Sequence, residues 1–325
     1  MTEQKVIPAL GHDYVDGICT RCEEEEPSEK PTVTRFSGED RYSTAFNVAE
    51  AMKEIMKVKT FDSIVVAYGR NFADALAGSY LANELDAPIL LTEDSFQDDV
   101  IAYIAENLSE NGKVYILGGT SSVSASFEED LEEAGINRER LSGSNRYLTN
   151  LAILTEAGLN GKTILVCDGS NFADSLSASS LDLPILLVGK TLSDDQMEYL
   201  ETLEDVSFRI IGGVNSVSES VADALKAYGT VERISGNTRE ETSVKVAEAF
   251  FSSPETILLA YSRNYPDGLC GGPQAYQLGA PLILVNSGAE SFATDYVAEN
   301  EITSGIILGG TSSVPEDVAN TIFPQ

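Results

Sequence analysis

The chain has 325 residues, which is long for one hydrophobic core and suggests two or three domains. It carries 52 acidic and 21 basic side chains, and this net charge of −31 argues against nucleic acid as a partner, because phosphate binding needs clustered Lys and Arg. No window approaches the roughly 20 uninterrupted apolar residues that span a bilayer, so we expect no membrane insertion.

Residues 1–33 form an acidic leader with a motif of its own. The leader lacks a basic start followed by an apolar run, so no signal peptide is visible. His12 precedes the pair Cys19-x-x-Cys22, and three such ligands could hold zinc with a fourth from elsewhere; a disulfide or free thiols are the alternatives. An acidic run from Glu23 to Glu26 then predicts an exposed linker.

Four motifs recur three times in one order after the leader, which predicts three modules. The modules cover residues 34–138, 139–231 and 232–325. Because each module is large enough to own a core, these are not the turns of a solenoid.

The first motif carries two arginines six residues apart. It reads "RFSGEDRY", "RLSGSNRY" and "RISGNTRE" in the three copies. A guanidinium suits carboxylate or phosphate, so the arginines could build local anion sites on an acidic surface. Alternatively, each pairs with an acid across a module boundary in a salt bridge repeated by symmetry. The arginines are Arg35 and Arg41, Arg140 and Arg146, and Arg233 and Arg239.

The second motif lies between a predicted strand and a helix start. It reads "GRNFADALAG", "GSNFADSLSA" and "SRNYPDGLCG". Its aspartates could cap the helix or fix the turn, or they could contact a ligand at the carboxyl end of the strand. The candidate residues are Arg70, Asn71 and Asp74, then Asn171 and Asp174, then Arg263, Asn264 and Asp267.

The last two motifs predict buried strands. "APILLT", "LPILLV" and "APLILV" are short apolar runs after a proline, and "YILGGTSSVS", with its two counterparts, is a strand that ends in a glycine pair. The glycine pairs match neither a Walker loop nor a GxGxxG motif, so no nucleotide site is expected.

Strands alternate with helices throughout each module. The segment "STAFNVAEAMKEIM" from Ser43 has apolar residues at helical spacing, whereas "SIVVAY" is a short apolar run. This alternation predicts an α/β fold, with a parallel sheet flanked by helices in each module. Three similar modules in one chain are expected to pack around a pseudo-threefold axis, as an intramolecular pseudo-trimer.

Enzyme chemistry has little support in the modules. The only histidine of the chain is His12, so a Ser-His-Asp or Cys-His centre is excluded there. No pair of carboxylates stands out in all three copies, and a carboxylate-based hydrolase is a remote alternative.

The repeated motifs resemble the cell wall-binding repeat type 2, a family found in triplicate on surface proteins of Gram-positive bacteria. The resemblance runs from Thr34 to the C-terminus. It implies three toprim-like modules that hold a secreted protein to the wall without a covalent bond, and hence an extracellular location in the cell wall or surface layer. It also implies an anionic wall polymer as the ligand.

In that family the aliphatic triplet after the proline is implicated in binding, although the pattern alone predicts a buried strand. The third copy departs from the family pattern, as do "NYPD" in place of "NFAD" and "TREE" in place of the Arg-Tyr pair. The residues carried over are Pro88, Ile89, Leu90 and Leu91, then Pro184, Ile185, Leu186 and Leu187, then Pro281, Leu282, Ile283 and Leu284.

The favoured hypothesis is a monomeric wall-anchoring protein whose intermodule clefts bind a repeating anionic glycopolymer. The arginines would neutralise ligand charge, and the Asp and Asn of the second motif would orient hydroxyls. No cofactor is required, although divalent cations could bridge the ligand to this acidic chain. The alternatives are a hydrolase of wall polymers and a protein-protein scaffold that forms surface arrays.

Overall fold

The structure is a computed structural model that describes residues 14–15, 18–19, 30–159 and 162–324. His12 and Cys22 of the predicted zinc motif lie outside the described residues. Cys19 lies in β2 (Ile18–Cys19), which pairs antiparallel with β1 (Tyr14–Val15). The remaining strands form three four-stranded sheets in which every pairing is parallel, and this confirms the α/β class.

The first sheet has the strand order β5-β4-β6-β7. Its strands are β4 (Phe61–Tyr68), β5 (Ile89–Thr92), β6 (Leu108–Leu117) and β7 (Asn137–Leu141). Its helices are α1 (Arg41–Met56), α2 (Ala73–Ala77), α3 (Ser79–Glu84), the 3-10 helix η1 (Asp94–Phe96), α4 (Gln97–Asn107) and α5 (Ala125–Glu133).

The second sheet repeats this order as β9-β8-β10-β11. Its strands are β8 (Thr163–Asp168), β9 (Ile185–Val188), β10 (Ser207–Ile211) and β11 (Thr230–Ile234). Its helices are α6 (Arg146–Ala157), α7 (Ala173–Ala178), α8 (Asp194–Glu201) and α9 (Glu219–Leu225).

The third sheet, of order β13-β12-β14-β3, takes its last strand from the other end of the sequence. Its strands are β12 (Thr256–Tyr261), β13 (Leu282–Val285), β14 (Ser304–Leu308) and β3 (Thr32–Phe36). Its helices are α10 (Arg239–Phe250), α11 (Gly271–Gln277), α12 (Ser291–Glu299) and α13 (Glu316–Ile322).

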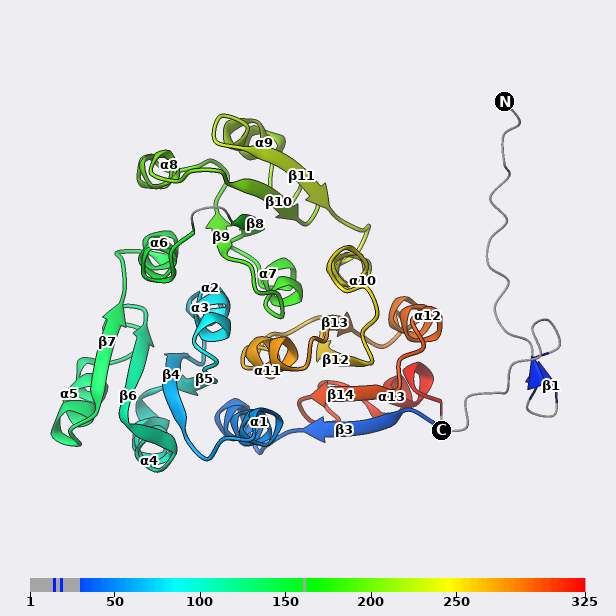
Figure 1. The fold of residues 1–325 in the computed structure, drawn as a ribbon, viewed down its shortest axis with the longest axis horizontal. Helices are drawn as coiled ribbons and strands as arrows, with labels where there is room; N and C mark the ends of the chain where they lie inside the picture. Colours follow the sequence, from blue (N-terminus) through cyan, green and yellow to red (C-terminus); the bar gives the residue numbers. More distant parts are fainter. Residues whose placement is uncertain (1–13, 16–17, 20–29, 160–161, 325) are drawn as a thin grey trace.

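Sequence repeat and sheet are therefore offset by one strand. The strand that carries the first arginine of each repeat is the outer strand of the preceding sheet: β7 pairs with β6, and β11 pairs with β10. The expected module boundaries after residues 138 and 231 fall inside β7 and β11. By the same rule, β3 pairs with β14 and closes the chain into a ring (Figure 1).

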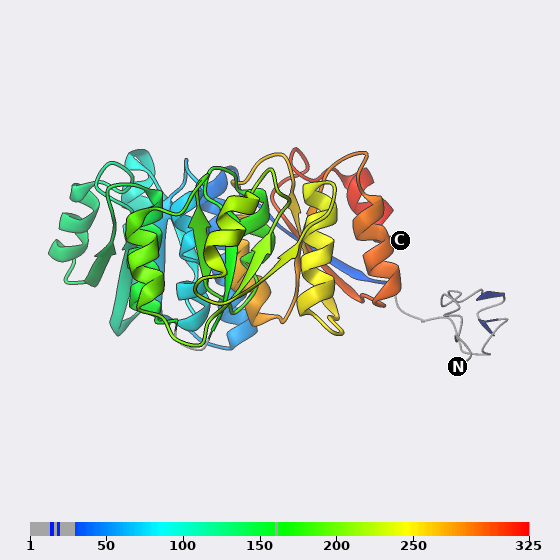
Figure 2. The same cartoon turned by 90° about the horizontal axis from the view of Figure 1, so that it is seen from above.

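The three sheet units surround a common centre, where α2 and α3, α7, and α11 gather (Figure 1). The helices α10 (yellow) and α12 (orange) run along the short dimension of this flat arrangement (Figure 2). One hydrophobic cluster spans all three units and includes Leu76, Leu176 and Leu269, each no more than 1% exposed. The modules therefore share a core as well as owning smaller ones.

Polar caps fix where the helix after each first motif begins. Asp40, Asn145 and Thr238 accept backbone N–H bonds at the starts of α1, α6 and α10. The second arginine of each motif follows its cap directly, so it occupies the first helical position. No helix in the described part of the chain is long and apolar enough to cross a membrane.

Candidate functional site

The first arginine of each motif binds the glycine turn of the preceding repeat. Arg35, Arg140 and Arg233 each donate from Nη1 to a carbonyl oxygen, that of Gly309 (2.9 Å), Gly118 (2.8 Å) and Gly212 (2.9 Å). Each arginine also pairs with a glutamate in the first turn of the helix that follows that glycine. These glutamates are Glu316, Glu128 and Glu219. The first arginines thus form the salt bridge repeated across repeat boundaries, and they join β3, β7 and β11 to the neighbouring repeat.

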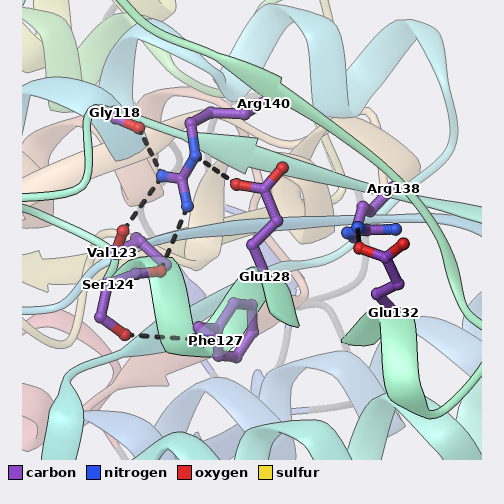
Figure 3. A network of polar contacts seen from close by, with 8 residues as sticks. All are labelled: Gly118, Val123, Ser124, Phe127, Glu128, Glu132, Arg138 and Arg140. Carbon is purple, nitrogen blue, oxygen red and sulfur yellow. Dashed lines mark hydrogen bonds and ion pairs between the residues drawn. The ribbon is translucent and has the colours of Figure 1, made fainter. Parts of the chain in front are cut away.

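Arg140 has the densest set of these contacts (Figure 3). Besides Gly118, it donates to the carbonyl oxygens of Val123 (3.0 Å) and Ser124 (3.2 Å), and its Nε lies 2.7 Å from Glu128 Oε2. Charge-assisted hydrogen bonds of this kind are stronger than neutral ones. Its guanidinium thus binds three carbonyl oxygens and a carboxylate of the protein itself.

The second arginine of each motif lies at a boundary between modules. Arg41, Arg146 and Arg239 donate from Nη1 to the carbonyl oxygen of Gly69 (2.6 Å), Gly169 (2.6 Å) and Ser262 (2.7 Å). That carbonyl directly follows β4, β8 or β12 in the arginine's own module. At the same time, the arginine faces the module before it.

Arg146 and Arg239 each contact an aromatic ring of the preceding module. The Arg146 guanidinium carbon lies 5.4 Å from the ring centroid of Phe72, and that of Arg239 lies 5.3 Å from Phe172. These distances suit a cation-π interaction. In the other two copies a tyrosine follows the second arginine in the sequence. Arg239 has no such tyrosine, but it contacts an aromatic ring of the preceding module.

The aspartates of the second motif lie against the glycine turns. A Cβ on Gly118 would lie 2.5 Å from Asp74 Oδ2, and Gly212 and Gly309 approach Asp174 and Asp267 equally closely. All three glycines have positive φ, of 97°, 106° and 92°, which only glycine adopts readily. Asp267 also accepts a 2.5 Å bond from the Ser313 hydroxyl. The turn-fixing interpretation of these aspartates agrees with this geometry, and α2 shows no side-chain cap from its N-cap residue Phe72.

Burial changes the acidity of two of these carboxyls. Asp74 and Asp174 are each 8% exposed. Burial raises the pKa of Asp174 to about 6, helped by the negative charge of Asp168 and opposed by the Ser216 hydroxyl and Arg239. Burial likewise raises the pKa of Asp74, against Arg146 and Ser122. In both cases an arginine of the next module acts on the aspartate.

The remaining polar residues of the second motif have local roles. The side-chain oxygens of Asn71, Asn171 and Asn264 accept backbone N–H bonds one or two residues on. Arg70 pairs with Glu93, and this holds the pKa of Glu93 at about 2. Arg263 is exposed.

Sequence reasoning missed an aromatic cluster made by the second motif. The rings of Phe72, Phe172 and Tyr265 meet edge to face, with centroids 5.5 to 6.2 Å apart. The Tyr265 hydroxyl also donates to the Arg70 carbonyl oxygen at 2.8 Å. The sequence does show an aromatic residue two positions before each aspartate. That these three rings contact one another follows only from how the three modules pack.

The aliphatic triplets are fully buried strands. Every side chain from Ile89 to Leu91, from Ile185 to Leu187 and from Leu282 to Leu284 is at most 1% exposed. Pro88, Pro184 and Pro281 are buried as well. The structure gives these side chains no surface for a ligand, so a part in binding would act through the shape of the strand ends.

A cleft of about 260 Å³ lies where module 1 meets module 3. Module 1 contributes Gly38 to Arg41, and module 3 contributes Tyr261, Asn264, Pro266 and Asp267 together with Gly310, Ser312 and Ser313. We call this the closure cleft, because the β3–β14 pairing forms it. The second arginine, the aspartate of the second motif and the glycine turn thus come together from two modules.

The third repeat departs from the others by a paired substitution. In the first two repeats a tyrosine ring covers a glycine, and a Cβ on Gly69 or Gly169 would lie 2.6 Å from the ring of Tyr42 or Tyr147. The third repeat has Ser262 and Glu240 at these positions, and the buried Ser262 hydroxyl donates to the Glu240 carboxylate at 2.5 Å. The larger residue after β12 is thus matched by the loss of the tyrosine ring.

Metal ligands and thiols are also relevant to the chemistry of the described residues. These residues contain no group of three or more His, Cys, Asp or Glu placed to hold a metal ion. Cys167 and Cys270 are free and buried, and burial raises the pKa of both thiols. The zinc motif in the leader stays a prediction.

Family comparison agrees with the repeat pattern. The model of the family described as cell wall binding domain 2 matches residues 35–128, 140–222 and 233–319.

The chain belongs to the cell wall binding domain 2 family.

Each matched range of this family begins at or next to the first arginine of a motif, on a strand that completes the preceding sheet.

Related proteins in Bacillus subtilis and Clostridium difficile share the same region. The chain is 28% identical over 298 residues to the N-acetylmuramoyl-L-alanine amidase LytC of B. subtilis, covering 90% of this chain and 58% of LytC. It is 29% identical over 297 residues to the amidase enhancer of that organism, covering 90% and 40%.

Solved structures extend the likeness to the fold. Cwp8 from C. difficile superposes with a TM-score of 0.79 at 29% identity, covering 91% of this chain and 52% of Cwp8. Cwp6 from C. difficile superposes with a TM-score of 0.75 at 24% identity, covering 90% and 48%, and shows the fold alone. The chain spans about half the length of these relatives.

Proposed function

We propose that this chain anchors a larger secreted protein to the bacterial cell wall by binding an anionic wall polymer in the clefts between its modules. Membership of a cell wall binding family supports the wall as the target. The observation that carries the choice of site is the closure cleft, where Arg41 of one module faces Asp267 and Ser313 of another.

The cleft combines the groups that an acidic sugar polymer needs. A guanidinium binds phosphate or carboxylate, while serine, asparagine and tyrosine side chains can exchange hydrogen bonds with sugar hydroxyls. Equivalent arginines recur at the other two boundaries, so three weak sites engage successive units of a repeating polymer. Avidity then gives tight attachment without a covalent bond.

The net charge of −31 restricts how a polyanion can approach. Surface charges are screened beyond roughly 8 to 10 Å at physiological salt, so a local arginine can act against a repelling body. Divalent cations could also bridge the acidic surface to the polymer, and chelation separates the two routes. Loss of binding on chelation supports bridging, whereas strong salt sensitivity without a chelator effect supports direct arginine contact.

Cosedimentation with purified Gram-positive walls tests the proposal. We expect binding that falls when mild acid strips the secondary polymers from the wall. The triple variant Arg41→Gln, Arg146→Gln and Arg239→Gln should weaken binding by at least about tenfold, since each site loses a charge-assisted contact.

A charge-matched control is available outside the clefts. The variant Arg138→Gln, Arg209→Gln and Lys226→Gln removes the same charge from surface ion pairs. It should bind walls as the unmodified protein does. Equal binding by the cleft variant and this control, or binding that ignores acid stripping, would rule out the proposed site.

A further inference from the structure

The three module boundaries share a backbone framework but differ in the charge of the residues that match the lining of the closure cleft. In each, a glycine of the first motif donates its backbone N–H to a threonine hydroxyl at 3.0 Å, from Gly38, Gly143 and Gly236 in turn. Each second arginine also binds the equivalent carbonyl oxygen at 2.6 or 2.7 Å. The residues that line the closure cleft can therefore be matched position by position at the other two boundaries.

The closure cleft is strongly acidic. Arg41 is accompanied there by Glu39, Asp40 and Asp267, which gives a formal charge of −2 from one cation and three carboxylates. The Asp40 side chain accepts the backbone N–H bonds of Tyr42 and Ser43 at the start of α1, which fix its position beside Arg41. Glu39 is exposed.

The cleft between modules 2 and 3, at Arg239, has an intermediate charge. The positions of Glu39 and Asp40 are taken by Asn237 and Thr238, which are neutral. Asp168, however, stands where the other modules have Tyr68 and Tyr261, and its charge acts on Asp174. One arginine and two aspartates leave a formal charge of −1.

At the boundary between modules 1 and 2, the positions that match the closure cleft carry no excess negative charge. Here Ser144 and Asn145 replace the two acids, and Asn145 still caps α6 through its side-chain oxygen. At the positions that match the closure cleft, the charged residues are Arg146 and Asp74, so their formal charge is zero. Beside these positions, Glu93 and Asp94 line a hollow with Tyr68 and Ser122, and Glu93 is paired with Arg70.

We infer that the three clefts are unequal, and that an anionic ligand binds first at Arg146, then at Arg239, and least at Arg41. This inference rests on the proposed function and deepens it by ranking its sites. Like charges beside a binding site act against an anionic partner, so Glu39 and Asp40 select against it. The closure cleft is then the weakest of the three sites for an anionic ligand.

Three matched single variants test the ranking in the full chain. Arg41→Gln, Arg146→Gln and Arg239→Gln each remove one charge and the same carbonyl contact. Arg146→Gln and Arg239→Gln also lose a contact with a phenylalanine ring, so these two are matched most closely in their cost in stability. In cosedimentation with purified Gram-positive walls, we expect Arg146→Gln to weaken binding by about tenfold, Arg239→Gln by about threefold and Arg41→Gln by about twofold.

A gain-of-binding variant separates charge from structure. Glu39→Gln with Asp40→Asn gives the closure cleft the neutral loop of the Arg146 cleft, and Asn keeps the helix cap. We expect about threefold tighter wall binding. The control Glu198→Gln with Glu201→Gln removes two exposed acids on α8 and should change binding less.

The outcomes of this experiment are distinct. Tighter binding by the loop variant than by its control, with Arg146→Gln the weakest single variant, supports the ranking. Equal losses from the three arginine variants, or the largest loss from Arg41→Gln, overturn the ranking while leaving wall binding intact. If the unmodified protein fails to bind walls, the proposed function falls and the ranking falls with it.

Discussion

The two arginines of one eight-residue motif have different surroundings. The first, at 35, 140 and 233, is bound to a glycine-turn carbonyl and a glutamate of the neighbouring repeat. The second, at 41, 146 and 239, makes one carbonyl bond and faces a cleft or an aromatic ring. A repeated residue type can therefore serve architecture at one position and a binding surface six residues later.

Removing a first-arginine strand should break the architecture most. Deletion of residues 1–36 takes away β3, its five paired positions with β14 and the contacts of Arg35. We expect a loss of roughly 3 kcal/mol or more in the free energy of unfolding, which lowers the melting temperature by several degrees. Thermal unfolding followed by circular dichroism measures it.

The matched control deletes residues 1–29 and keeps β3. It should melt within about a degree of the full chain, because β3 and its contacts remain. Equal melting of the two truncated proteins would show that closure of the ring contributes no stability.

Substituting Arg140 should cost more stability than substituting Arg35. Arg140→Ala loses four hydrogen bonds and leaves three carbonyl oxygens without this donor, so we expect a loss of about 2 to 3 kcal/mol. Arg35→Ala loses one carbonyl bond and a pair with the exposed Glu316, which is worth about 1 kcal/mol. Urea denaturation of both variants decides the order, and a larger loss from Arg35→Ala would contradict it.

The two adjacent glycines of the turn that Arg140 binds should differ in their tolerance of alanine. Gly118→Ala places a methyl group against Asp74 at a φ of 97°, so we expect about 2 kcal/mol of destabilisation. Gly119→Ala meets no heavy atom within 4 Å and should be nearly neutral. Urea midpoints for the pair measure the difference, and equal midpoints would mean that the turn relaxes freely.

The sequence predicted the α/β class and the family because these depend on local patterns. Apolar strands, helical periodicity and the order of the four motifs are all visible without coordinates. The helix expected from Ser43 begins two residues earlier, at Arg41, and the strand that ends at Tyr68 lies where its apolar run places it.

Pairings between distant residues were beyond the sequence. The exchange of β3, β7 and β11 between repeats depends on strand order, which apolar patterning does not encode. Contacts such as Arg146 with Phe72 depend in turn on that exchange. The two alternatives for the arginines stayed open for this reason, since a guanidinium looks the same in sequence whether a carbonyl or a ligand binds it.

The smallest effect that we expect concerns Asp174, the buried aspartate on which the second arginine Arg239 acts. Its pKa is about 6 in the folded protein against an ordinary value of 3.8, so the folded state holds this proton more tightly than the unfolded chain does. The stabilising contribution is complete below pH 3.8 and is lost as the pH rises through 6. Asp174→Asn cannot take up the proton, and its Oδ1 can still accept the Ser216 hydroxyl.

The unmodified protein should therefore gain about 1 kcal/mol relative to Asp174→Asn when the pH falls from 7 to 5. Paired urea titrations at the two pH values isolate this term, because the other carboxylates titrate in both proteins and cancel. A gain of equal size in both proteins would place the titration elsewhere. A gain confined to the unmodified protein would show that Arg239, supplied by the next module, leaves Asp174 only partly compensated, as the acidic character of that cleft requires.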